Sequence, residues 1–253
     1  MTREEQILCG HLLDLARICG NSGRPVSSGF LSLAEQDLFL TVCVPKLPGV
    51  QWRLDGGTEN AERKAVCYTA QGAGRDECPA PCVLLKAEQT NPRFAEKLTH
   101  RDYLGALMNL GLERSVIGDL LPVENGCYII CLEHAADFIC GQYSLVRHTA
   151  VRCARVPWTD FQYTPATKEI RGTVSSVRLD SLIAIAFRES RSRMAPLIAG
   201  EKVYVNGKCV RSASYLPHPG DLISVRGKGK FRYAESGGVT KKGRVSVLIE
   251  RFV

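Results

Sequence analysis

The sequence predicts an α+β protein built from several domains. Three observations support this fold class: an N-terminal helical segment followed by strand-like patches, a central alternation of strands and helices, and a C-terminal pair of short helices followed by a β-hairpin. We expect an N-terminal helical and mixed α/β region over residues 1–75, a central βαβαβ domain over residues 76–165 and a C-terminal domain over residues 172–253 with its core at residues 178–231.

The N-terminal region begins with apolar residues at helical spacing between Glu4 and Ile18, which predicts an amphipathic helix. Glycine, serine and proline indicate a loop at Asn21–Ser28. Phe30-Leu31-Ser32, followed by Ala34-Glu35-Gln36, is typical of a cap and a second short helix. The strands predicted after it are Leu38–Val44, Val50–Leu54 and Ala65–Thr69.

The central domain follows a stretch rich in glycine and proline, Ala70–Pro81, which indicates a loop or a boundary. Strands are expected at Val83–Ala87, Gly126–Leu132 and Ala150–Arg155, and helices at Arg101–Leu110 and Ala135–Leu145. This order predicts a small open α/β layer, RRM-like or ferredoxin-like. The polar stretch Tyr163–Arg171 is then predicted to be a linker.

The C-terminal domain opens with apolar residues on one helical face between Arg178 and Phe187. A second helix can begin with Ser190 or Ser192 as its N-cap and end at Gly200. A β-hairpin follows, because Asn-Gly between two alternating runs favours a type I′ turn. We expect two helices on a small sheet made from Lys202–Val205, Lys208–Val210 and Leu222–Val225, followed by a flexible basic loop, Arg226–Lys230.

Charge separates the last third of the chain from the rest. From Gly172 to the end there are 15 Lys or Arg against 6 Asp or Glu, whereas residues 1–171 carry 18 against 20. The excess positive charge of the protein, +7 in total, therefore lies in the C-terminal domain. A basic domain beside a near-neutral body is typical of phosphate binding, because each neutralised phosphate releases counterions.

The basic residues gather at two places that suit RNA. One is the start of the second helix, where free backbone N–H groups favour phosphate. The other is the loop with Gly227 and Gly229, which lets the backbone approach a ligand closely. The candidate RNA-binding residues are Arg178, Arg188, Ser190, Arg191, Ser192, Arg193, Lys202, Asn206, Lys208, Arg226, Lys228 and Lys230.

A second RNA contact is possible at His100 and Arg101, beside the predicted helix start at Thr99. His100, Arg101 and Asp102 could instead be a catalytic cluster, because such side chains move protons. Thr99 and Asp102 also suit a capping pair, so we expect no catalytic site here.

The eleven cysteines are scattered through apolar stretches, which is typical of small buried residues rather than disulfides. Cys78/Cys82 and Cys127/Cys131 could be combined into a zinc site. Cys127 and Cys131 fall on one face of a predicted strand, however, and structural zinc sites usually use tighter spacing. We therefore expect no metal and no cofactor.

No run of 18 uncharged apolar residues occurs, and the N-terminus lacks the order of a signal peptide. We therefore expect a cytoplasmic protein that does not contact a membrane, and we expect it to be monomeric.

A series of short motifs keeps a regular order over about 55 residues of the C-terminal domain: Arg178-Leu179-Asp180, Ser190-Arg191-Ser192, Leu197-Ile198, Gly200, Val203-Tyr204-Val205-Asn206-Gly207, Gly220-Asp221 and Ile223-Ser224-Val225-Arg226-Gly227. In order and spacing these motifs resemble the αL RNA-binding motif of the S-four ribosomal-protein family. One departure is Pro196, which removes a backbone donor within the second helix, so a local distortion is expected there.

A second set of motifs lies in the body of the chain: Gly56-Gly57, Ala61-Glu62-Arg63-Lys64, Leu98-Thr99-His100-Arg101-Asp102-Tyr103-Leu104-Gly105-Ala106-Leu107, Gly111 and Ile117-Gly118-Asp119. With these motifs the body resembles the YlmH family, whose members carry this RNA-binding domain at the C-terminus. The resemblance implies a factor that binds ribosomal RNA and tRNA on the large ribosomal subunit, in ribosome-associated quality control of stalled translation, and a link to cell division.

Two other classes of function remain open from the residues alone. One is an RNA-modifying enzyme acting on ribosomal RNA or tRNA through its N-terminal domain, for which His100 or Asp102 would be essential to turnover. The other is a scaffold that binds proteins through residues 1–160 without RNA.

Overall fold

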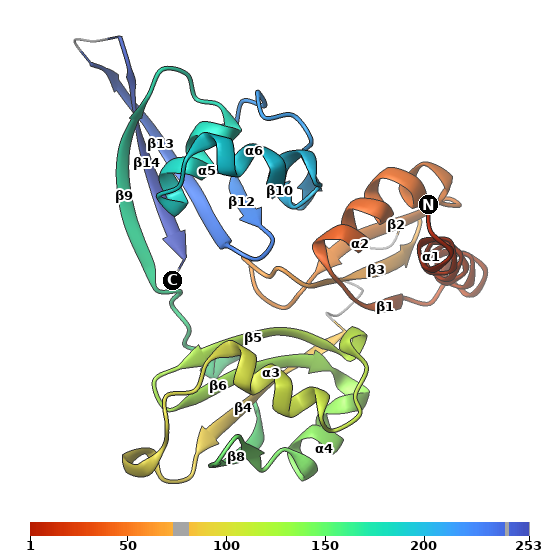
Figure 1. The fold of residues 1–253 in the computed structure, drawn as a ribbon. Helices are drawn as coiled ribbons and strands as arrows, with labels where there is room; N and C mark the ends of the chain where they lie inside the picture. Colours follow the sequence, from red (N-terminus) through yellow and green to blue (C-terminus); the bar gives the residue numbers. More distant parts are fainter. Residues whose placement is uncertain (73–80, 241–242, 253) are drawn as a thin grey trace. The chain divides into compact units, whose positions relative to one another are not determined.

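The structure, a computed structural model, describes residues 1–72, 81–240 and 243–252. The chain forms two compact units, which we call the N-terminal unit, residues 1–163, and the C-terminal unit, residues 164–253 (Figure 1). Most of the predicted loop at Ala70–Pro81, and with it the predicted domain boundary after residue 75, lies outside the described residues. None of the helices in the described part of the chain has the length and apolarity needed to span a membrane.

The first part of the N-terminal unit is a three-stranded sheet with a long helix against it. Cys9, Leu12, Ala16 and Cys19 form the buried side of that helix, as the helical spacing predicted. A capping box on Thr2 starts it, and Gly23 ends it in the left-handed conformation. The elements are α1 (Arg3–Ser22), β1 (Val26–Leu31), α2 (Leu33–Leu38), η1 (Phe39–Cys43), η2 (Val44–Lys46), β2 (Val50–Asp55) and β3 (Lys64–Ala70), with sheet order β1-β3-β2.

Two predictions for this region are wrong. The predicted strand at Leu38–Val44 is helical, because Phe39 and Cys43 are four residues apart and both point into the core. The predicted loop at Asn21–Ser28 ends earlier than expected, because β1 begins at Val26 and pairs with β3. Ser32 does form the predicted cap, with Glu35 completing a capping box.

The second part of the N-terminal unit is a five-stranded antiparallel sheet in the order β5-β6-β4-β8-β7. Strands β4, β5, β6 and β8 with helices α3 and α4 follow the βαββαβ order of ferredoxin-like folds. The three predicted strands and two predicted helices are present, but the predicted βαβαβ order lacked β5 and the short β7. The elements are β4 (Cys82–Gln89), η4 (Pro92–Phe94), α3 (His100–Met108), η5 (Arg114–Val116), β5 (Ile117–Val123), β6 (Gly126–Leu132), α4 (Glu133–Gln142), β7 (Leu145–Val146), β8 (Thr149–Val156) and η6 (Trp158–Asp160).

Both faces of this sheet are covered. One face packs against α3 and α4 through a core that includes Leu85 and Ile129. On the other face, Tyr128 packs with Phe30 of the three-stranded sheet, and the ring of Phe161 lies edge-on at 5.2 Å from that of Tyr128. The face that RRM-type domains leave open for RNA is therefore occupied by the chain itself.

Arg63 ties the two sheets of the N-terminal unit together. Its guanidinium donates hydrogen bonds to the carbonyl oxygens of Ile117 at 3.0 Å, Phe30 at 2.8 Å and Arg114 at 3.2 Å. Asp119 accepts the backbone N–H groups of Glu62 and Arg63 at 2.7 and 3.0 Å. Burial lowers the pKa of Arg63, yet its five donors allow one side chain to satisfy several buried carbonyls.

The C-terminal unit packs two short helices on one face of a six-stranded sheet, ordered β11-β10-β12-β13-β14-β9 (Figure 1). Leu182, Ile183 and Ile198 of the helices meet Ile223 and Ile249 of the sheet in one buried cluster. The elements are β9 (Thr167–Val174), α5 (Leu179–Phe187), α6 (Arg191–Ala199), β10 (Val203–Val205), β11 (Lys208–Cys209), β12 (Leu222–Val225), β13 (Gly229–Val239) and β14 (Val245–Phe252).

The predicted helical hairpin and β-hairpin are confirmed, and Asn206 and Gly207 both have positive φ, 49° and 83°, as a type I′ turn requires. Helix α6 continues through Pro196, the sixth residue of the helix, so the proline removes one intrahelical bond without ending the helix.

The sheet of the C-terminal unit is larger than predicted. The predicted linker Tyr163–Arg171 is wrong over its second half, because all eight residues of β9 pair with β14. The predicted flexible loop Arg226–Lys230 is also wrong at its end, because Gly229 and Lys230 already belong to β13.

Candidate nucleic-acid interface

Helix α5 begins against the loop that joins β11 to β12. No side chain caps it; instead Leu179 N–H donates to the Tyr215 carbonyl at 2.8 Å and Asp180 N–H to the Ala213 carbonyl at 3.3 Å. These backbone groups are therefore satisfied within the protein. A ligand that reaches this end of α5 must be met by side chains rather than by free N–H groups.

The connection between the helices is tight. Helix α5 ends at Arg188, which adopts the left-handed conformation with φ 53° although it is not glycine. Ser190 then caps α6, and its side-chain oxygen accepts the N–H of Arg193 at 3.3 Å. Two residues, Glu189 and Ser190, thus separate the left-handed Arg188 from the first turn of α6.

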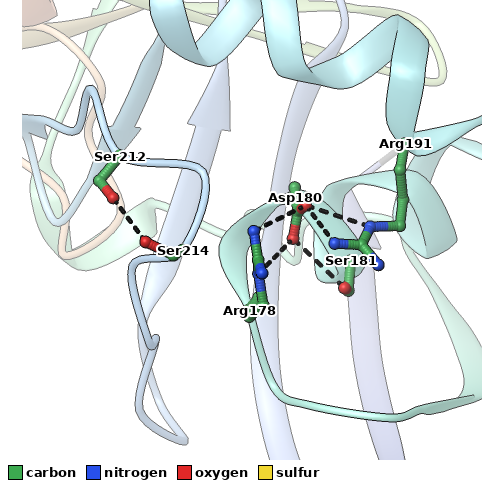
Figure 2. Close-up of polar contacts among 6 residues, drawn as sticks. All are labelled: Arg178, Asp180, Ser181, Arg191, Ser212 and Ser214. Atoms are coloured by element: carbon green, nitrogen blue, oxygen red, sulfur yellow. Dashed lines mark hydrogen bonds and ion pairs between the residues drawn. The ribbon is translucent and has the colours of Figure 1, made fainter.

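A buried carboxylate organises the two arginines nearest the helix starts. Asp180 is 5% exposed. Its Oδ2 accepts from Nε and Nη2 of Arg191 at 3.1 and 2.5 Å, and Arg178 Nε lies 3.3 Å from its Oδ1 (Figure 2). Ser181 Oγ adds a contact at 3.3 Å. Two cations share one anion, so the cluster keeps a net positive charge, and both guanidinium groups remain partly exposed.

A second carboxylate joins the helical hairpin to the basic loop. Glu189 accepts from Arg193 at 3.0 Å and from Lys228 at 2.9 Å. These two hydrogen bonds lower the pKa of Glu189, so the bridge is fully formed above the ordinary glutamate pKa and is lost as pH falls through the lowered value. The structure thus brings together the two groups of basic residues that the sequence separated by 35 positions, Arg193 and Lys228.

Three further predicted residues lie near Lys228. Arg226 N–H donates to the Lys202 carbonyl at 2.8 Å, so these two exposed residues are neighbours beside the turn at Gly227. Lys230 lies on β13 with its ammonium 5.3 Å from the centre of the Phe252 ring. Lys202, Arg226 and Lys228 therefore share one end of the sheet.

Asn206 and Lys208 lie at the other end of β10. The side chain of Asn206 donates to Asp221 at 2.8 Å, and its oxygen accepts the N–H of Leu222 at 3.0 Å. This amide holds the hairpin to β12. The presence of Asn206 in the sequence motif is therefore explained by these hydrogen bonds within the protein. Of the remaining predicted residues, Arg188 and Ser192 are exposed beside the hairpin connection, and Ser190 and Ser192 share a hydrogen bond at 2.9 Å.

His100 and Arg101 start α3 in the N-terminal unit. Asp102 accepts the N–H of Thr99 at 2.8 Å and also contacts Arg147 at 3.4 Å, so this carboxylate serves the helix cap and an ion pair. Desolvation of the ring and the nearby Arg114 lower the pKa of His100, which keeps the ring neutral at physiological pH. Arg101 is exposed, so its guanidinium is accessible to a phosphate.

Three of the four cysteines considered as metal ligands, Cys82, Cys127 and Cys131, are buried. Burial raises the pKa of both Cys82 and Cys131 to about 12, which favours the neutral thiol over the thiolate that binds zinc. Cys78 lies outside the described residues. Within residues 1–72, 81–240 and 243–252, no group of three or more His, Cys, Asp or Glu is arranged to hold a metal ion.

Sequence reasoning missed the two acidic residues that organise the basic ones. Asp180 was available as part of the Arg178-Leu179-Asp180 motif, and its place on the apolar side of a short helix indicates a buried carboxylate that needs cationic partners. For Glu189, the i,i+4 spacing to Arg193 was a usable signal, whereas the contact with Lys228 depends on the fold.

We expect Asp180→Ala to lower the free energy of unfolding by about 1–3 kcal/mol, because it leaves Arg178 and Arg191 without their shared acceptor. Urea unfolding of the full chain, followed by circular dichroism, measures this change. Glu201→Ala is the matched control, because it breaks an exposed pair with Arg211 and should cost less than about 0.5 kcal/mol. Equal losses in the two variants would contradict the organising role of Asp180.

Comparison with known proteins covers both units. A family model described as a putative RNA-binding domain in YlmH matches residues 85–160, and an S4 domain model matches residues 177–223. The Bacillus subtilis protein named ribosome-associated protein quality control protein P2 is 31% identical over 253 residues, covering 98% of this chain and 96% of that one.

Two further similarities are more limited in extent or identity. Small ribosomal subunit protein uS4 of Chromohalobacter salexigens is 38% identical over 66 residues, 26% of this chain and 32% of that protein. A solved structure named cell division protein ylmH from Streptococcus pneumoniae has a TM-score of 0.49 and 18% identity, covering 63% of this chain and 95% of that one. The near end-to-end similarity to the B. subtilis protein, with the two domain models, shows that this chain belongs to the YlmH family.

Proposed function

We propose that the protein binds structured RNA through the C-terminal unit, with a basic surface made by Arg178, Arg191, Arg193 and Lys228. The observation that carries the proposal is the arrangement of four cations around two carboxylates, Asp180 and Glu189. Each carboxylate holds two cationic side chains in place without cancelling their charge. Cations that are held in place and partly exposed suit contacts with phosphate groups. A protein that binds RNA through phosphate contacts recognises the shape of the RNA more than its base sequence.

We further propose that the RNA is ribosomal RNA together with tRNA on the large ribosomal subunit, during quality control of stalled translation. The support is the B. subtilis relative, whose name describes a ribosome-associated quality control protein and which aligns over 98% of this chain. That name describes association and no reaction, and Asp102 of the candidate catalytic cluster serves a helix cap. A binding role is therefore favoured over RNA modification.

In the N-terminal unit, Arg101 at the start of α3 is the residue we favour for a second RNA contact. The helix-free face of the five-stranded sheet is covered by Phe30 and Phe161, so RNA would have to meet this unit elsewhere. We expect this contact to be weaker than that of the C-terminal unit. The other nearby cation, Arg147, is paired with Asp102 and Glu96, so the local positive charge is small.

Salt dependence of RNA binding tests the charged surface. Arg193→Gln and Lys228→Gln should each weaken binding of the full chain to a ribosomal RNA fragment, and each should reduce the slope of log K against log salt by about 1. Fluorescence anisotropy across a salt series measures both quantities.

The matched control is Arg171→Gln, which removes an equal charge from an exposed ion pair with Glu169 on the edge strand β9 of the same unit and should leave the slope nearly unchanged. Glu189→Gln separates the effect of placing Arg193 and Lys228 from the effect of net charge, because it removes the bridge and also adds one unit of positive charge. If placement of Arg193 and Lys228 matters, this variant does not bind more tightly despite its extra net positive charge. Equal slopes for all four variants would rule out this surface.

The choice of ribosomal RNA is tested in cells. Crosslinking followed by sequencing of the RNA bound to the wild-type protein should recover large-subunit ribosomal RNA and tRNA, and the Arg193→Gln/Lys228→Gln double variant should recover much less. Predominant recovery of small-subunit RNA would contradict the large-subunit assignment while leaving RNA binding intact. Recovery unchanged in the double variant would contradict the site.

A further inference from the structure

The loop between β11 and β12 is held firmly against the start of α5. Ala213 and Tyr215 accept the N–H groups of Asp180 and Leu179, and Tyr215 N–H donates to the Ser212 carbonyl at 3.1 Å. Ser212 and Ser214 share a hydrogen bond at 2.9 Å within the loop, which Figure 2 shows beside Arg178 (Figure 2). The loop is therefore a fixed part of the surface that carries the Asp180 cluster.

Two large apolar side chains on this loop stay exposed. Tyr215 is 36% exposed and Leu216 is 59% exposed, whereas the following Pro217 is buried and anchors the chain. Among the described residues of the C-terminal unit, these are the large hydrophobic side chains that remain most accessible. Two other tyrosines of the same unit, Tyr204 and Tyr233, are almost completely buried. The unit can therefore bury tyrosine rings in its core, and Tyr215 lies outside that core.

The charge next to Tyr215 is positive. Its carbonyl bonds to the residue that follows Arg178, and the carboxylate of Asp180 is already shared by Arg178 and Arg191. The first backbone N–H groups of α5 are occupied by the loop, so an incoming anion would be met by the guanidinium groups alone. An exposed aromatic residue whose backbone adjoins the residue after Arg178 matches one nucleotide, with its base on the ring and its phosphate on an arginine.

We propose that Tyr215 is a stacking platform for an unpaired base in the RNA bound by the C-terminal unit. This inference rests on the proposed function and adds a preference: the bound RNA carries an unstacked nucleotide, in a loop or a bulge, next to a paired stem. The paired stem provides phosphates for the charged surface, and the unpaired base contacts Tyr215, with Leu216 extending the apolar surface.

The test compares two RNA probes on the full-length protein. One is a stem-loop with a single 2-aminopurine in its loop, and the other is the same stem closed into a duplex without unpaired nucleotides. Tyr215→Ala should weaken binding of the stem-loop roughly five-fold or more, the loss expected for one base–aromatic stack. It should leave duplex binding within about two-fold, and the quenching of 2-aminopurine by the wild-type protein should disappear.

Tyr215→Phe keeps the ring and should retain both affinity and quenching. Phe138→Ala is the control for loss of an exposed aromatic ring, because Phe138 is 47% exposed on α4 of the N-terminal unit. Thermal unfolding of each variant shows whether the fold survives. If Tyr215→Ala unfolds, Tyr215→Leu, which keeps the apolar bulk without the aromatic ring, gives the same comparison.

The outcomes separate the two proposals. If the charged variants Arg193→Gln and Lys228→Gln weaken binding while Tyr215→Ala affects neither probe, the stacking inference is wrong and the RNA-binding proposal stands. The same result with loss of a protein partner on Tyr215→Ala would make the loop a protein-docking surface instead. If the wild-type protein binds neither probe, both proposals fall.

Discussion

The buried carboxylate of Asp180 is the interaction on which the surface of the C-terminal unit depends. It lies on the inner side of α5, and its two arginine partners come from the residue before α5 and from the first turn of α6. A buried ion pair adds little net stability, because the desolvation of the charges opposes their attraction. The ion pairs of Asp180 instead fix the positions of two guanidinium groups, and one of the two positive charges remains uncompensated.

Glu189 repeats this arrangement at the outer side of the hairpin. It bridges Arg193 and Lys228, so that the turn between β12 and β13 is joined to the helical hairpin in one surface. A recognition surface that is held in place before binding loses less side-chain entropy when the ligand arrives. The long strands β9, β13 and β14 give this surface a rigid base, because α5 packs directly on them.

Features encoded in neighbouring residues could be predicted. The caps at Ser32 and Ser190 and the Asn206-Gly207 turn depend on local backbone conformation, and each was confirmed. In the central region, helical and strand periodicity predicted both helices and three of the strands, but not β5. Charge and motif spacing also picked out the candidate arginines, whose role in RNA binding stays a prediction.

Features that depend on contacts between residues far apart in the sequence could not be predicted. Strand β9 contains polar and charged residues typical of a linker, and only its eight pairs with β14 make it a strand. Strand β5 contains Pro122 and the charged Asp119, whose carboxylate binds backbone N–H groups more than fifty residues earlier. The segment Phe39–Cys43 is rich in β-formers yet helical, because packing against α1 and Tyr68 outweighs its local preference. The contact between Glu189 and Lys228 likewise exists only in the folded unit.

The most direct measurement is to map protein–RNA crosslinks by mass spectrometry on large ribosomal subunits carrying the full-length protein and tRNA. We predict that crosslinked peptides come mainly from residues 178–193, 211–217 and 226–230, with ribosomal RNA or tRNA attached. Crosslinks confined to the N-terminal unit, or to the opposite end of β10 at Asn206 and Lys208, would contradict it.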